Sequence, residues 1–227
     1  MIDFDPVRGM DDNQYPALRI AGRFVAIEKS LELLSEYVPL IQNQAQRRAR
    51  ASIPNKPVGW SQVDIDEWND ETNWVTEALI PRFFLGSFIL QLAAAFETAR
   101  KDIANYVEVT TQHPKPVRGD MAARSDFERY LHEALSSPLD IPPDVSQRLD
   151  DIQCVRNFLA HSNGDLRAER SSDRKARIVA LAQENCGIRI HESELVFEER
   201  FLQESFLCVE RYLNATIAYA VHREPHS

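Results

Sequence analysis

The sequence is short of the residues that mark several common protein classes. Glycine accounts for only 7 of the 227 residues, which argues against a β protein rich in tight turns. The three cysteines are odd in number and widely spaced, so neither a disulfide framework nor a zinc pattern is supported. The formal net charge of −9 excludes a general nucleic-acid coat protein, which needs a positive surface.

Signals for membranes, secretion and metal binding are also missing. The acidic, polar N-terminus does not resemble a signal peptide. The most apolar stretch, residues 83–96, is about 14 residues long, which is short for a membrane span and typical of a buried core helix. The fragment His191-Glu192-Ser193-Glu194 lacks a third metal ligand in register. We therefore expect a cytoplasmic protein that contacts no membrane and uses no metal or cofactor.

What the sequence does contain is helical periodicity, with Leu, Ala, Glu and Arg frequent in its middle and end. We expect Pro81 to kink or divide a helix, and Ser125 to Glu128 to form a capping box at the start of another. Helices are predicted at about 20–51, 61–107, 125–135, 144–162, 173–185 and 198–222. The predicted fold is therefore an all-α bundle with long N-terminal helices and a small β-hairpin near 186–197. Residues 1–18 are expected to be a flexible tail, and 19–227 a single helical domain.

An arginine interrupts the apolar face of the helix predicted at 144–162. On a helical wheel, Arg156 lies at the centre of a face formed by apolar residues: Leu149, Ile152, Leu159 and Ala160. A guanidinium group in such a position needs a carboxylate, a phosphate or a set of carbonyl groups. Asn157 and His161 share a different face, four residues apart, where the helix is predicted to end at Asn163-Gly164.

Arg156 and His161 do not point in the same direction on an ideal helix, which separates them by about 140°. Two arrangements bring them together. The end of the helix is distorted, or a two-fold dimer places this helix against its own copy so that one site takes residues from both chains.

The run Arg156-Asn157-Phe158-Leu159-Ala160-His161 resembles the Arg-x4–6-His motif of the HEPN superfamily, in which a polar residue often follows the arginine. The resemblance in fold covers roughly residues 85–222. Many HEPN proteins are dimeric, metal-independent ribonucleases of toxin–antitoxin, abortive-infection and antiviral systems. The resemblance therefore implies an RNA substrate, a homodimer, and an antitoxin or other defence protein as a partner.

The chemistry of the motif residues fits the cleavage of RNA, which carries its own nucleophile in the 2′-hydroxyl group. The resemblance implies that His161 accepts the 2′-hydroxyl proton and that Arg156 stabilises the charge on the phosphate. Asn157 either holds that phosphate or orients the imidazole. The products are a 2′,3′-cyclic phosphate and a 5′-hydroxyl. Glu97 resembles the acidic residue that HEPN proteins often carry on an early core helix, and it is the candidate partner of Arg156. Basic residues after the motif are candidates for RNA binding: Arg167, Arg170, Arg174, Lys175 and Arg177.

Each of these residues also has a structural interpretation. Arg156 is explained by a buried ion pair, and His161 by its favourable position at the negative end of a helix dipole. Glu97 has Lys101 four residues away as an ordinary helix-surface partner. The basic residues after the motif are also typical of a solvated helix start. At the level of function, the alternatives are a non-catalytic HEPN-like module that binds RNA or a protein, and a purely structural helical protein.

Overall fold

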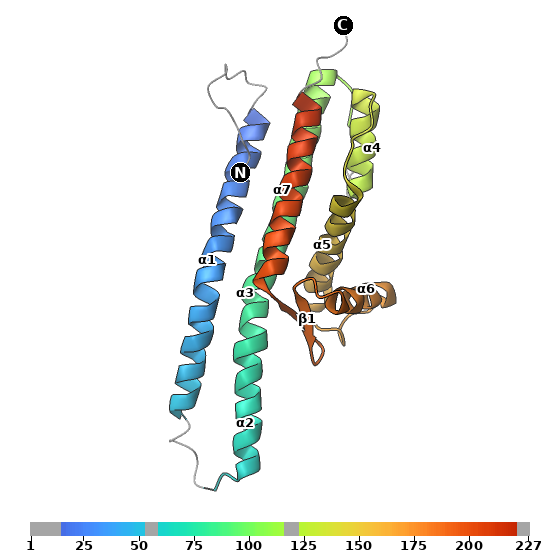
Figure 1. Ribbon diagram of the computed structural model, residues 1–227. Coiled ribbons are helices and arrows are strands. Elements are labelled where there is room, and N and C mark those ends of the chain that lie inside the picture. The colour runs from blue at the N-terminus through green and yellow to red at the C-terminus, as the bar shows by residue number, and fades with distance from the viewer. Residues whose placement is uncertain (1–14, 53–58, 116–122, 222–227) are drawn as a thin grey trace. The chain divides into compact units, whose positions relative to one another are not determined.

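The computed structural model describes residues 15–52, 59–115 and 123–221 and has the predicted all-α fold with one small β-hairpin (Figure 1). The helical elements are α1 (Tyr15–Ser52), α2 (Gln62–Trp74), the π-helical η3 (Val75–Leu79), α3 (Ile80–Thr111), α4 (Arg124–Leu135), α5 (Pro143–Ser162), α6 (Ser172–Gln183) and α7 (Glu199–Val221). The strands β1 (Ile188–His191) and β2 (Glu194–Phe197) are antiparallel. Of the predicted tail, residues 15–18 belong to α1, and residues 1–14 lie outside the described part of the chain.

The described residues divide into two compact units. The first takes its residues from 1–27, 92–150 and 205–227, and the second takes them from 28–91 and 151–204. Helices α1, α3, α5 and α7 therefore each contribute residues to both units. The two units are treated separately below.

Aromatic rings form much of the core of the first unit. Phe24 packs against Phe206 with 6.1 Å between the ring centroids, and Phe96 meets the ring of Tyr212 edge-on at 5.3 Å. The Tyr212 hydroxyl donates a hydrogen bond to Glu128 Oε1 at 3.0 Å. The buried Tyr212 hydroxyl therefore keeps a hydrogen bond, so burying the ring does not carry the cost of an unsatisfied polar group.

The start of α4 differs from the prediction. The residue that caps α4 is Ala123, which makes no side-chain hydrogen bond to the helix, and Ser125 lies inside the first turn. The predicted capping box is therefore wrong. Glu128, whose carboxylate such a box requires, instead accepts hydrogen bonds from Arg124 at 2.8 Å and from Tyr212.

Pro81 affects the second unit, as predicted, but by a widened turn rather than a sharp break. Proline has no N–H group, and its ring crowds the carbonyl four residues earlier. The five residues of η3, which end two positions before Pro81, are π-helical. The side-chain amide of Gln42 in α1 donates to the Thr76 carbonyl of this turn at 2.9 Å. Helix α2, η3 and helix α3 therefore continue as one run.

That run, Gln62–Thr111, contains 50 residues and is long and apolar enough to cross a membrane by length and composition alone. Half of its apolar window is buried inside the molecule, and the core helix of a globular protein passes the same test. The burial agrees with the predicted core helix at residues 83–96.

The hairpin of the second unit is fixed by its pairing and by one glycine. Ile188 pairs with Phe197 and His191 with Glu194 across the two strands. Gly187 precedes β1 with a φ of 84°, and a Cβ atom built on it would lie 2.7 Å from the backbone nitrogen of Phe201. Glycine is therefore required at this position both by conformation and by the close approach of α7.

Gly187→Ala is expected to destabilise the protein by about 2–4 kcal/mol, because it adds backbone strain and a clash with backbone atoms. Gly22→Ala is the matched control. Gly22 lies inside α1, where a Cβ atom would meet no neighbouring atom within 4 Å, and alanine there should stabilise the helix by about 0.5–1 kcal/mol. Urea unfolding measures both. Equal effects at the two positions would contradict this account of Gly187.

Candidate functional site

Helix α5 carries the motif and ends where the sequence predicts. It begins at Pro143, in agreement with the preference for proline in a first turn. Asn163 and Gly164 follow its last residue with φ angles of 51° and 77°, which turn the chain away from the helix axis. His161 lies in the last turn with an exposed side chain. The imidazole is therefore accessible to a substrate.

Arg156 is half-buried and does not lie at the centre of the buried face. In this part of α5 the fully buried side chains are Val155 and Phe158, whereas Ala160 is exposed. The buried face predicted for α5 from a helical wheel is therefore wrong after residue 154. The reason is that the predicted face left out Val155 and Phe158, which are 0% exposed, so the buried face is not centred on Arg156.

Two donors converge on the Asn157 side chain. Arg156 Nη1 donates to Asn157 Oδ1 at 3.0 Å, and Gln153 Nε2 donates to the same oxygen at 3.0 Å. A carbonyl oxygen has two lone pairs, so these bonds use its capacity as an acceptor. The amide nitrogen of Asn157 is consequently the end of the side chain that Arg156 and Gln153 do not engage. Sequence reasoning did not single out Gln153, although its spacing of four residues from Asn157 is a signal for such a bond.

The structure leaves the role of Glu97 as a prediction. Glu97 belongs to the first unit and Arg156 to the second. Within the first unit, burial lowers the pKa of Arg100, while Tyr212 and the Glu97 carboxylate act in the opposite direction. The charge of Glu97 therefore stabilises a buried guanidinium group three residues further along α3.

The basic segment after the motif is largely neutralised by carboxylates. Its ion pairs are Arg167 with Asp165 at 3.1 Å, Arg174 with Glu169 at 2.8 Å, and Arg177 with Asp151 at 2.6 Å and Glu184 at 2.9 Å. The hydrogen bonds from Arg167 lower the pKa of Asp165 to about 2. Arg170 is exposed and Lys175 is half-buried. The pairing favours the structural interpretation of this segment, and its binding of RNA stays a prediction.

A buried ion pair that the sequence analysis missed fixes the chain after His161. Arg82 of α3 pairs with Glu194 of β2, and the two residues are only 7% and 8% exposed. Around this pair, Leu195 N donates to Gly164 O at 2.9 Å, and Leu166 N donates to Ser193 O at 2.8 Å. The loop that ends α5 is thereby held against the hairpin.

Two large apolar side chains are exposed on the part of α3 that belongs to the second unit. A Cβ atom on Gly86 of α3 would lie 3.5 Å from Leu159 Cδ2, so this part of α3 packs on α5. Phe83 and Leu90 are three residues before and four residues after Gly86, on the same flank of α3. They are 57% and 38% exposed. Large side chains so exposed are typical of an interaction surface.

Comparison with known proteins adds no relative from which a role can be transferred. No family model, curated protein or solved structure matches the chain. Among the described residues, no group of three or more His, Cys, Asp or Glu side chains is placed to hold a metal ion. The candidate site therefore rests on the chemistry of α5 itself.

Proposed function

We propose that the protein is a cytoplasmic, metal-independent endoribonuclease of the HEPN type, acting in antiviral defence or toxin–antitoxin biology. The observation that carries this proposal is the arrangement on α5. Arg156 is hydrogen-bonded to Asn157, and the exposed His161 follows one turn later, before the helix ends. A cation, an amide donor and an imidazole within six residues of one helix support the proposal.

In the proposed reaction, His161 accepts the proton of the RNA 2′-hydroxyl group, and the 2′-oxygen attacks the adjacent phosphorus atom. The bond from phosphorus to the 5′-oxygen breaks, and the leaving oxygen takes up a proton. The products are a 2′,3′-cyclic phosphate and a 5′-hydroxyl. Arg156 stabilises the negative charge that develops on the phosphate oxygens, because a guanidinium group donates to two oxygens in a fixed geometry.

Of the two roles predicted for Asn157, the hydrogen bonds favour the one at the phosphate. Its oxygen already accepts from Arg156 and Gln153, so its N–H groups remain to donate to an anion. Arg156 and Asn157 would then present donors side by side to the same phosphate.

The proposal is tested with an RNA oligonucleotide and a DNA oligonucleotide of the same sequence, incubated with the protein in EDTA. We expect the RNA to be cut and the DNA to remain intact, because DNA lacks the 2′-hydroxyl nucleophile. Mass spectrometry of the fragments should show 2′,3′-cyclic phosphate ends. Cleavage of both strands, or fragments with 5′-phosphate ends, would contradict the mechanism.

We further propose that the site is completed in a homodimer. Phe83 and Leu90 present apolar surface on the segment of α3 that packs on α5 at Leu159. A second copy that covers them would bring its own α5 to the same place, which resolves the angular separation of Arg156 from His161.

Phe83→Glu/Leu90→Glu is expected to convert the dimer to a monomer and to abolish RNA cleavage. The substitutions would bury two carboxylates from each subunit in the interface without cationic partners. Light scattering after size-exclusion chromatography measures the mass. Val109→Glu is the control, since Val109 is also on α3 and is 72% exposed. An active wild-type monomer would contradict the composite site.

The second candidate function is a non-catalytic HEPN-like module that binds RNA or a protein. The observation that favours it is the pairing of Arg167, Arg174 and Arg177 with carboxylates, which leaves little unpaired positive charge after the motif. RNA binding without cleavage would select this function.

A further inference from the structure

Helix α2 is only loosely packed on the second unit. None of its 13 residues is fully buried, and one face is half-buried, formed by Ile65, Trp68, Asn69 and Thr72. Its start is nevertheless well formed, because the Ser61 hydroxyl accepts from Asp64 N and the Asp64 carboxylate accepts from Ser61 N at 2.6 Å. Most helices in proteins owe their stability to a packed face. Helix α2 is continuous with η3 and α3, which follow it, and its apolar Val63 is 64% exposed.

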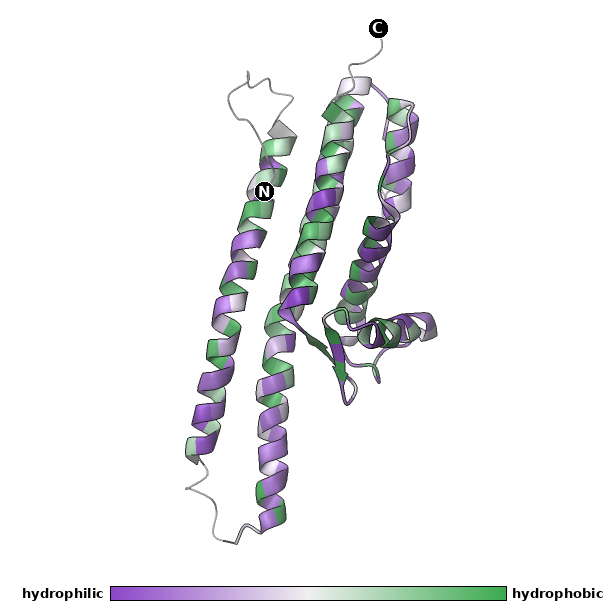
Figure 2. Cartoon of the chain, viewed as in Figure 1, coloured by the Kyte–Doolittle hydropathy of each residue, from purple (hydrophilic) through white to green (hydrophobic). Residues whose placement is uncertain are grey.

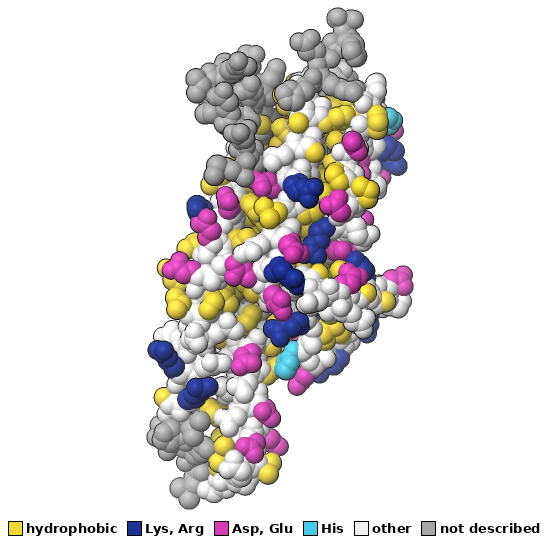
Figure 3. Space-filling model, viewed as in Figure 1, with side chains coloured by type: hydrophobic (Ala, Val, Ile, Leu, Met, Phe, Trp, Pro, Cys, Tyr) yellow, Lys and Arg dark blue, Asp and Glu magenta, His cyan; other side chains and the backbone are white. Residues whose placement is uncertain are grey.

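The surface of α2 and η3 is strongly acidic. Residues 57–81 contain no Lys or Arg. Six carboxylates lie in this stretch: Asp64, Asp66, Glu67, Asp70, Glu71 and Glu77. In the described part of the chain, none of them forms an ion pair with a basic side chain. Figure 2 shows the hydrophilic character of α2, and Figure 3 shows acidic side chains over the same segment. Like charges three and four residues apart repel each other, so this composition opposes helix formation in the free protein.

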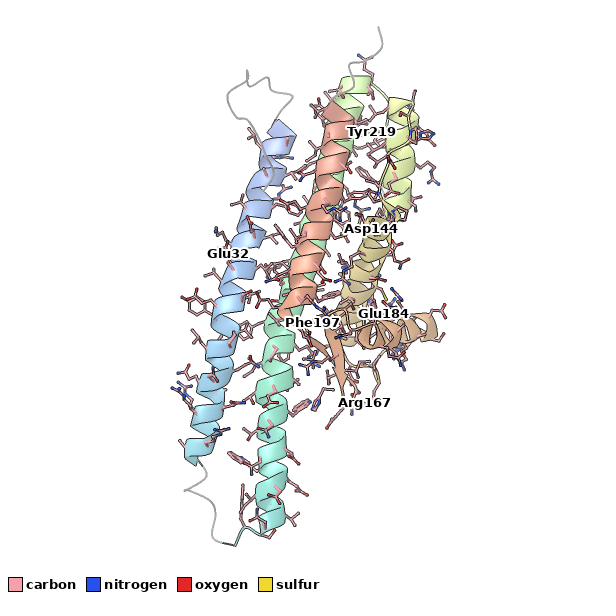
Figure 4. All side chains as sticks on the ribbon, viewed as in Figure 1. Glu32, Asp144, Arg167, Glu184, Phe197 and Tyr219 are labelled. Atoms are coloured by element: carbon pink, nitrogen blue, oxygen red, sulfur yellow. The ribbon has the colours of Figure 1, made fainter. Side chains whose placement is uncertain are left out.

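A cavity of about 710 Å³ adjoins this acidic surface in the second unit. One wall of it is formed by Asp70, Glu71, Trp74 and Glu77. Another wall is formed by Arg167 and by the β1–β2 hairpin, which contributes Arg189 (Figure 4 labels Arg167). The two arginines are already neutralised, Arg167 by Asp165 at 3.1 Å and Arg189 by Glu198 at 3.0 Å. The unpaired charge of the cavity is therefore negative.

Trp74 adds an aromatic ring to this wall, and its indole nitrogen is an unsatisfied donor within the described part of the chain. Its indole Nε1 is buried and has no hydrogen-bond acceptor among the described residues, although a buried indole N–H usually has one. Its ring offers a face for a guanidinium group. Asp70 lies four residues before Trp74 and Glu77 three residues after it, so carboxylates flank the ring on one face of the helix.

We propose that the acidic surface of α2 and η3, together with this cavity, is the docking site for an arginine-bearing segment of a partner protein. The guanidinium groups of the segment pair with Asp70, Glu71 and Glu77 and stack on Trp74. Arginine fits better than lysine, because its planar guanidinium group pairs with two oxygens of a carboxylate and stacks on an aromatic ring. This surface is separate from the residues of the proposed nuclease reaction.

The test measures fluorescence anisotropy of a labelled peptide of alternating arginine and alanine, titrated with the full chain. Asp70→Asn/Glu71→Gln is expected to weaken binding about tenfold. Glu36→Gln/Glu133→Gln removes two exposed carboxylates on α1 and α4 and should leave binding unchanged. The matched lysine peptide should bind more weakly than the arginine peptide. Circular dichroism verifies that both variants remain helical.

Three results would overturn the proposal. The first is no binding of the arginine peptide to the wild-type protein. The second is equal weakening by both double variants, which would show general attraction to a negative protein. The third is a wild-type oligomer that Asp70→Asn/Glu71→Gln dissociates, which would make this surface an interface between copies of the chain. RNA cleavage should be unchanged in Asp70→Asn/Glu71→Gln, so failure here is distinguishable from failure of the proposed nuclease.

Discussion

His161→Ala is expected to lower the rate of RNA cleavage by about 100- to 10,000-fold, the usual contribution of a general base. The loss should appear in the rate of the chemical step under single-turnover conditions, because His161 takes the proton from the nucleophile. Stability should change little, because the imidazole is exposed at the end of α5.

His132→Ala is the matched control for this variant. His132 is also an exposed histidine in the last turn of a helix, α4, and it shares the favourable interaction with the helix dipole. If His161 acted only through its interaction with the helix dipole, the two variants would have the same small effect on stability and no effect on cleavage. Equal cleavage rates would therefore contradict a catalytic role.

Arg82→Leu is expected to destabilise the protein by about 3–5 kcal/mol, because it leaves the buried carboxylate of Glu194 without its partner. Glu194→Leu should have an effect of similar size, since it leaves a buried guanidinium group unpaired. Urea unfolding followed by circular dichroism measures both variants.

The double variant Arg82→Leu/Glu194→Leu distinguishes the cost of leaving one buried charge unpaired from the loss of the attraction between the two charges. Replacing both partners with apolar side chains is expected to be far less harmful than replacing either one, and close to neutral. If the double variant loses as much stability as either single variant, the pair contributes through attraction alone, and if it loses the sum of the two, the residues are not coupled; either result would contradict our account of its burial.

The helices and the hairpin could be predicted because they depend on local patterns. Periodic apolar residues placed α5 and α7 within one or two positions, and Asn163-Gly164 marked the end of α5. The start of α4 was mispredicted because Glu128 is engaged by Arg124 and Tyr212, and Tyr212 lies 84 residues away in sequence. Long-range partners of this kind compete with local capping, and a local pattern does not contain them.

The candidate site was predictable as a set of residue types but not as a geometry. The motif identified Arg156, Asn157 and His161, and it did not reveal that Gln153 shares the Asn157 oxygen with Arg156. The helical wheel of α5 failed because it left out Val155 and Phe158, which are fully buried. The Arg82–Glu194 pair was missed because its partners are far apart in sequence, with Arg82 in an apolar run and Glu194 in the polar fragment that ends at β2.

The central claim is that Arg156 and His161 act together on one phosphate group. The measurement that tests it most directly is the single-turnover rate of RNA cleavage by the wild type, Arg156→Ala, His161→Ala and the double variant. Residues that act as a unit are strongly non-additive. We therefore predict that the double variant is no slower than the slower single variant. Losses that multiply in the double variant, or single variants that cleave at the wild-type rate, would contradict the claim.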